Sequence, residues 1–226
     1  MGGRSPGPSR RPGASAARRR GALALRDPRS EGLRLRGTAT NSGRHSESGF
    51  RYQPFYCEEN VWWLCAEPAL GPGECFVVFL VSRAGCCPML AQRAAPPGRL
   101  IAWDYHAVVA DARGRVWDLD SRLPLPSPGP DWLDASFALA DRLPRVYVPR
   151  LRVIPALDFQ KDFASDRGHM RDARGRYLRP PPPWPPIGSG TTLYRYLDPR
   201  ESQPGTLLDL PGARDWFNAR ARRLRD

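Results

Sequence analysis

The chain has 226 residues, of which 41% are hydrophobic, and a formal net charge of +12, a length that suits one ordinary domain with an appendage. No apolar run approaches the ~18 residues that span a bilayer, and no secretory signal begins the chain, so neither a membrane nor a secreted protein is expected. The five cysteines form no paired CxxC pattern, which argues against a disulfide framework and a structural metal site.

The N-terminal stretch 1–50 concentrates positive charge, with eleven arginines against three acidic residues, and shows no hydrophobic periodicity. We therefore expect a disordered Arg/Pro-rich extension before a folded domain over 51–226. Such a tail could hold nucleic acid electrostatically or act as an organelle transit peptide, and both are less favoured alternatives. The expected location is cytoplasmic, with the nucleus as a second compartment.

The first predicted element is a helix at residues 58–67, where apolar residues recur at helical spacing until Pro68 ends the pattern. Cys57 then lies at or just before the N-terminus of this helix. Glu58 and Glu59 fall in its first turn, where acidic side chains suit the helix dipole.

Further along the chain, the apolar run at 74–82 is typical of a strand covered on both faces. Residues 100–110 and 115–123 are predicted to form a hairpin, because a short connection with a glycine joins them. The remaining predictions are a short helix at 132–142, a strand at 146–153, a polar segment at 158–176, an irregular proline run at 180–186 and a C-terminal helix around 209–224.

The predicted hairpin brings a histidine close to an aspartate. If the turn pairs Ala110 with Gly114, His106 lies directly opposite Asp118, within cross-strand reach. Asp120 points to the same face, so the spacing favours Asp118 without excluding Asp120. A register one residue longer would separate the pair.

A cysteine at a helix N-terminus, a histidine on a strand and an aspartate on the next strand form a nucleophilic set, in which the imidazole moves the thiol proton and the carboxylate orients the imidazole. Glu58 and Glu59 would raise the pKa of the Cys57 thiol if they pointed toward it. The hypothesis therefore requires them to face away or to have another role. His169 and His45 are competing bases, and His45 lies in the tail.

Several strings together resemble the protein N-terminal glutamine amidohydrolase family. They are Tyr56-Cys-Glu-Glu-Asn60, Trp103-Asp-Tyr-His106, Trp117-Asp-Leu-Asp120, the stretch 163–170 and the prolines at 180–183. The resemblance runs in order from about Tyr52 to Phe217. It implies an α+β fold, an α-β-α sandwich around a mainly antiparallel sheet with a papain/transglutaminase-like cysteine hydrolase core.

The resemblance also implies a function. It makes residues 51–226 the catalytic domain with Cys57, His106 and Asp118 as its triad, and so decides between the two aspartates. The family deamidates N-terminal glutamine to glutamate on proteins and peptides, which prepares them for arginylation and degradation in eukaryotes. This chemistry needs no metal or organic cofactor, and a monomer that binds neither membrane nor nucleic acid is expected.

Selection of an N-terminal glutamine requires recognition of its free α-ammonium, and Asp104 and Asp166 are the candidates, since a charged group without a partner is costly to desolvate. One departure from the family pattern lies nearby, where Gly168 precedes His169 in place of a serine. The alternative functions are a papain-like peptidase or a transglutaminase-type enzyme with the same triad, or a nucleic-acid-binding module acting through the tail.

Overall fold

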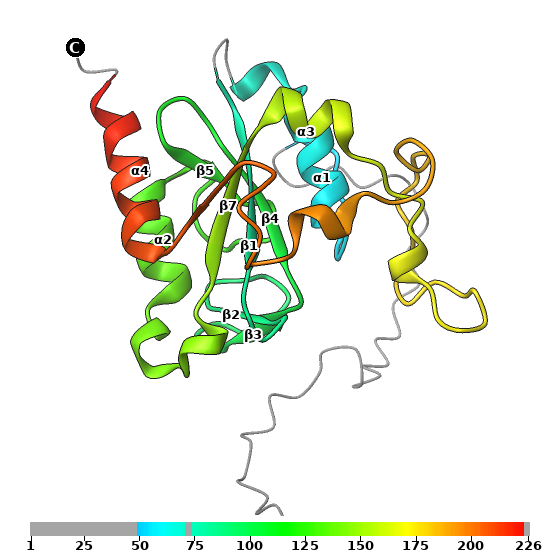
Figure 1. The fold of residues 1–226 in the computed structure, drawn as a ribbon, viewed down its shortest axis with the longest axis horizontal. Coiled ribbons are helices and arrows are strands. Elements are labelled where there is room, and N and C mark those ends of the chain that lie inside the picture. Colours follow the sequence, from blue (N-terminus) through cyan, green and yellow to red (C-terminus); the bar gives the residue numbers. More distant parts are fainter. Residues whose placement is uncertain (1–48, 71–73, 224–226) are drawn as a thin grey trace, which may run out of the picture.

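A six-stranded sheet forms the centre of the computed structural model, which describes residues 49–70 and 74–223 (Figure 1). The predictions for the N-terminal tail, His45 included, fall outside these ranges except at its last two residues. Every strand pairing in the sheet is antiparallel. In spatial order the strands are β6 (Ser127–Pro128), β5 (Arg115–Trp117), β4 (His106–Ala110), β1 (Phe76–Val81), β7 (Arg150–Pro155) and β8 (Thr206–Leu208).

Helices cover both faces of this sheet (Figure 1). On one side lie α1 (Cys57–Leu64) and α3 (Ala156–Asp162), and on the other α2 (Gly129–Phe137) and α4 (Leu210–Arg222). The expected α+β fold with a mainly antiparallel sheet is confirmed. None of the helices in the described ranges is both long and apolar enough to cross a bilayer.

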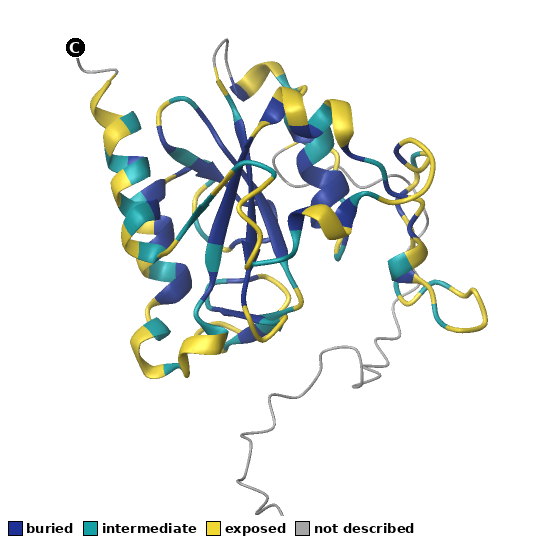
Figure 2. Ribbon diagram, in the orientation of Figure 1, coloured by how far each residue is buried: buried dark blue, intermediate teal, exposed yellow. Residues whose placement is uncertain are grey.

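The central strand β1 shows why the sheet is covered on both sides. Its six residues are all buried, which agrees with the continuous apolar run in the sequence (Figure 2). Val77 and Phe79 belong to the core beneath α1 and α3, whereas Val78 and Leu80 belong to the core beneath α2 and α4. Alternation along one strand thus supplies two hydrophobic cores.

Smaller elements complete the fold. A separate two-stranded sheet pairs β2 (Cys87–Met89) with β3 (Ile101–Trp103). Short 3-10 helices lie at η1 (Pro68–Leu70), η2 (Ala140–Arg142), η3 (Arg145–Tyr147), η4 (Gly168–Met170) and η5 (Leu193–Tyr196). The predicted strand at 100–110 is therefore divided between two sheets, because the chain bends between Trp103 and His106. The sequence pattern also missed α3 and β8.

The predicted hairpin register is wrong by two residues. Ala110 pairs with Val116, because Asp111 and Arg115 close the turn, one residue further along the chain than the expected pair of Ala110 and Gly114. The backbone N–H of Asp111 donates to the Arg115 carbonyl at 3.0 Å, and Gly114 takes the left-handed conformation that completes such a turn, with φ of 69°. His106 therefore does not face Asp118 directly across the ladder. The shift of two keeps the same side chains on the same face.

Candidate active site

Cys57 is the first residue of α1, in agreement with the prediction that it lies at or just before the helix N-terminus, and it retains 8% exposure. No side chain caps this helix end, so backbone N–H groups of the first turn remain available to another acceptor. Asn60 fixes the chain just before the helix, because its side-chain amide exchanges two hydrogen bonds of 2.9 Å with the backbone of Gln53. The backbone N–H of Ala107 lies close enough to the Cys57 sulfur to act against the rise in the thiol pKa, which places the thiol beside the first residues of β4.

His106 begins β4 and makes a buried ion pair with Asp118, although strand register does not align them. Nε2 of His106 lies 2.9 Å from Oδ1 of Asp118, and the two residues are 1% and 3% exposed. Asp118 reaches back to the histidine because β5 ends one residue earlier, at Trp117. An acceptor at Oδ1 requires the proton on Nε2, so the other ring nitrogen, Nδ1, is the basic one in the neutral imidazole.

Two further donors hold the Asp118 carboxylate. Nε2 of Gln92 and Nε1 of Trp132 donate to its Oδ2 at 3.0 and 3.1 Å. Burial by itself would raise the pKa of Asp118, but His106 and these hydrogen bonds outweigh it, and the pKa is lowered. Burial likewise opposes protonation of His106, whereas the Asp118 charge favours it and raises the histidine pKa. The pair is therefore built to stabilise an imidazolium.

Asp120, the alternative aspartate, has a different partner. Its Oδ1 accepts from the Tyr52 hydroxyl at 2.5 Å, and burial raises its pKa, to which the nearby Asp118 charge contributes. His106, Asp118 and Asp120 each place a potential metal ligand atom within 4.8 Å of the others. Both oxygens of Asp118 already accept hydrogen bonds, however, so the donor set is organised for proton chemistry.

Glu58 and Glu59, which follow Cys57, are both fully buried but have different partners. The Glu59 carboxylate accepts hydrogen bonds from the Arg167 guanidinium at 2.7 and 2.8 Å and from Nε1 of Trp184 at 2.8 Å. This ion pair ties α1 to the loop before η4. Glu58 instead turns toward the thiol, with its Oε2 3.8 Å from Cys57 Sγ. Burial, and then the Glu58 charge, raises the pKa of Cys57.

The other residues singled out from the sequence lie around this centre. His169 packs against Glu58, with Nε2 3.2 Å from Oε1, and is not hydrogen-bonded to the Asp118 pair. Asp104 lies exposed in the bend before β4. Asp166 is also exposed, and its Oδ1 accepts from the Gly168 backbone N–H at 2.8 Å, so that it shapes the turn leading to His169.

Sequence reasoning missed Gln92 and Trp132. Gln92 lies in a stretch without periodicity, and no motif marks it. Trp132 falls in a predicted helix, where its spacing indicates only a core residue. Its indole N–H reaches the Asp118 carboxylate only because α2 packs beside that residue.

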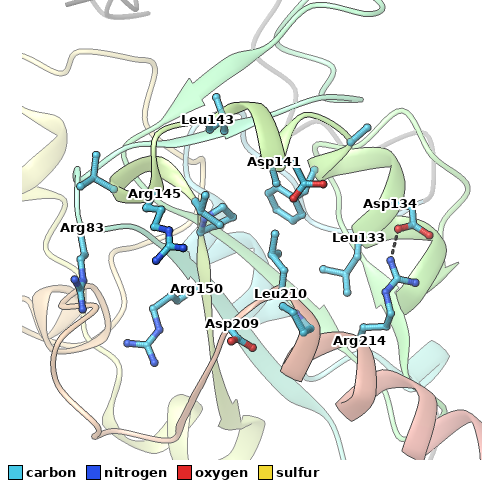
Figure 3. Close-up of a pocket in the computed structure, with 17 residues that line it drawn as sticks. Arg83, Leu133, Asp134, Asp141, Leu143, Arg145, Arg150, Asp209, Leu210 and Arg214 are labelled. Carbon is cyan, nitrogen blue, oxygen red and sulfur yellow. Dashed lines mark hydrogen bonds and ion pairs between the residues drawn. The ribbon is translucent and has the colours of Figure 1, made fainter.

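A groove of about 1070 Å³ lies elsewhere on the molecule (Figure 3). It is lined by α2, the start of α4 and the segment between α2 and β7, with several arginines at its edge, among them Arg83, Arg145 and Arg214. None of the residues that line it belongs to the Cys57 site. The groove is thus a feature separate from the candidate site.

The chain is similar to known proteins over most of its described length. The family model described as N-terminal glutamine amidase matches residues 52–217. The chain is 35% identical over 155 residues to the protein N-terminal glutamine amidohydrolase of Homo sapiens. The matched segment is 65% of this chain and 76% of the relative. The protein of the same name from Bos taurus is 34% identical over 172 residues, 71% of this chain and 83% of the relative. The protein of the same name from Arabidopsis thaliana is 36% identical over 151 residues, which are 61% of this chain and 68% of the relative. The chain belongs to the N-terminal glutamine amidase family.

Proposed function

We propose that this hydrolase converts an N-terminal glutamine of a protein or peptide to glutamate, with release of ammonia, through Cys57, His106 and Asp118. The observation that carries the proposal is the buried His106–Asp118 pair, which leaves Nδ1 as the basic ring nitrogen at the end of β4 where Cys57 lies. Family membership supplies the substrate class. No metal or cofactor is needed for the steps below.

The reaction begins with transfer of the Cys57 thiol proton to Nδ1 of His106, since the Asp118 charge stabilises the resulting imidazolium. The sulfur then forms a bond to the side-chain amide carbon of the substrate. Collapse of the tetrahedral adduct breaks the carbon–nitrogen bond, and the imidazolium gives its proton to the departing ammonia. A thioester remains.

Hydrolysis of the thioester uses the same groups. His106 takes a proton from water, the hydroxide adds to the thioester carbon, and the carbon–sulfur bond breaks to leave glutamate and the thiol. Both tetrahedral adducts carry an oxyanion. The backbone N–H of Cys57 is the proposed donor to it, because it lies at a helix end that no side chain caps.

The arrangement also supports the proposed relation to papain-like and transglutaminase-type hydrolases. A helix whose first residue is the cysteine packs against the strand that begins with the histidine, and the aspartate follows the next strand. The product, an N-terminal glutamate, is the proposed input to arginylation and degradation in eukaryotes.

The test measures ammonia release from a peptide that begins with glutamine and from its N-acetylated twin. We expect release only from the free-amine peptide, and none with Cys57→Ala. Cys65→Ala is the matched control, since Cys65 is a free cysteine just after the same helix and takes no part in the site. Wild-type protein that is folded but releases no ammonia would contradict the proposal. Mass spectrometry of the same samples for cleaved or cross-linked peptide would then test the peptidase and transglutaminase alternatives.

A further inference from the structure

Glu58 is a buried carboxylate whose hydrogen bonding is incomplete. It has no exposed surface, yet its Oε1 has no hydrogen-bond partner within the described residues. His169 Nε2 lies 3.2 Å from this oxygen without hydrogen-bond alignment, and Oε2 accepts from the Tyr105 hydroxyl at 2.9 Å. A buried carboxylate that lacks a full set of partners is costly, so such a group marks a place where a ligand can bind.

The next residue, Glu59, differs from Glu58 in its hydrogen bonding. Glu59 is equally buried, but both of its oxygens are occupied by Arg167 and Trp184. The two consecutive glutamates therefore differ in how many of their carboxylate oxygens are hydrogen-bonded. Glu59 holds the structure together, while Glu58 has binding capacity left over and lies beside the nucleophile.

We propose that the Glu58 carboxylate binds the α-ammonium of the substrate's N-terminal glutamine. This inference rests on the proposed function and names the group that makes the enzyme specific for a chain terminus. A charge-assisted hydrogen bond from the ammonium to Oε1 would complete the partners of the carboxylate. Asp104 and Asp166, the candidates from the sequence, are exposed, whereas Glu58 has the burial that makes such a bond selective.

The distances suit this assignment. Four bonds of about 1.5 Å link the α-nitrogen of glutamine to its side-chain amide carbon, so the two atoms lie at most about 5 Å apart. Glu58 Oε2, which is bonded to the same carbon as Oε1, is 3.8 Å from Cys57 Sγ, the atom that attacks the amide carbon. One glutamine can therefore place its amide against Cys57 while its ammonium contacts Glu58.

Binding at Glu58 would also assist the chemistry. The Glu58 charge opposes formation of the Cys57 thiolate, after burial the largest cause of the raised thiol pKa. A bound ammonium neutralises that charge at the moment when the thiolate is needed. An internal or N-acetylated glutamine brings no ammonium, so it loses both the contact and this help, and discrimination appears in kcat as well as in KM.

The experiment compares two peptides that differ only at the α-amine, one beginning with glutamine and one with a 4-carbamoylbutanoyl group, its des-amino analogue. We expect Glu58→Gln to lower kcat/KM for the glutamine peptide on the order of 100-fold, the size seen when one partner of a buried charge pair is removed. For the des-amino peptide kcat/KM stays the same or rises, because the opposing charge is gone. Glu58→Asp keeps the carboxylate and retains part of the preference.

Two controls separate recognition from folding. Glu74→Gln changes an exposed glutamate and should leave kcat/KM for both peptides unchanged. Alkylation of Cys57 by iodoacetamide, followed by mass spectrometry without substrate, should be faster in Glu58→Gln at neutral pH, which a merely structural role would not produce. Equal losses on both peptides, or an unchanged ratio between them, would overturn the inference while the amidase activity stands. If the wild type releases ammonia from neither peptide, the proposed function fails and this inference fails with it.

Discussion

Replacement of Asp118 by asparagine tests the proposed catalytic pair most directly. The change keeps the shape of the side chain and removes its charge. Nε2 of His106 and Oδ1 of Asp118 are 2.9 Å apart, so the charge centres lie about 4 Å apart, where the attraction between an imidazolium and a carboxylate is about 4 kcal/mol at an effective dielectric constant near 20. Since each 1.36 kcal/mol is a factor of ten in rate, we expect kcat to fall about 1,000-fold.

The assay is ammonia release from a glutamine-initiated peptide, with kcat and KM determined separately. KM should change little, because Asp118 is buried behind His106 and is not placed to touch substrate. Asp120→Asn is the matched control, since Asp120 is equally buried but accepts from Tyr52, and it should lose less activity. An Asp118→Asn enzyme that keeps more than about a tenth of wild-type kcat, or a more damaging Asp120→Asn, would refute the reasoning.

Three other predictions concern stability. Glu59→Gln leaves the buried Arg167 without its counter-ion, so we expect the free energy of unfolding in urea to fall by about 3–5 kcal/mol, and a loss below about 1 kcal/mol would contradict a desolvated pair. The His106–Asp118 pair contributes its full stabilisation of the folded state between pH 3.8 and 6.5, the ordinary pKa values of aspartate and histidine. Its contribution is lost as pH falls through the lowered pKa of Asp118 or rises through the raised pKa of His106, and unfolding of wild type and Asp118→Asn measured against pH should converge at both extremes. Gly114→Ala should lower the melting temperature by several degrees, since the residue has positive φ and a Cβ would meet a backbone oxygen at 2.6 Å; an unchanged melting temperature would argue against this turn.

The local spacing of apolar residues was sufficient to predict the elements whose buried positions follow a regular pattern in the sequence. The run at 74–82 predicted β1 because a strand covered on both faces must be apolar at every position. The helical spacing after Cys57 predicted α1, with the cysteine at or just before the helix N-terminus. These features depend on neighbours a few residues away.

The register of the hairpin could not be predicted from local pattern alone. The residue types and the glycine predicted a turn, but the side chain of Asp111, which accepts from the backbone N–H groups of Arg113 and Arg115, sets its length. The pairing therefore moved by two residues, and the contact between His106 and Asp118 survived because Asp118 lies beyond the end of its strand and reaches back. The expected pair was right and the expected geometry was wrong.

The sequence by itself determined the secondary structure near the nucleophile, the two-sided sheet and, through motifs, the family and its three candidate residues. Only the tertiary structure decided which donors hold Asp118 and which of the two adjacent glutamates has both carboxylate oxygens hydrogen-bonded. Gln92 and Trp132 lie 26 and 14 residues from Asp118, and Arg167 lies 108 residues from Glu59. The physical reason is that hydrogen-bond capacity belongs to a residue type, whereas its use depends on which distant segments packing brings within 3 Å.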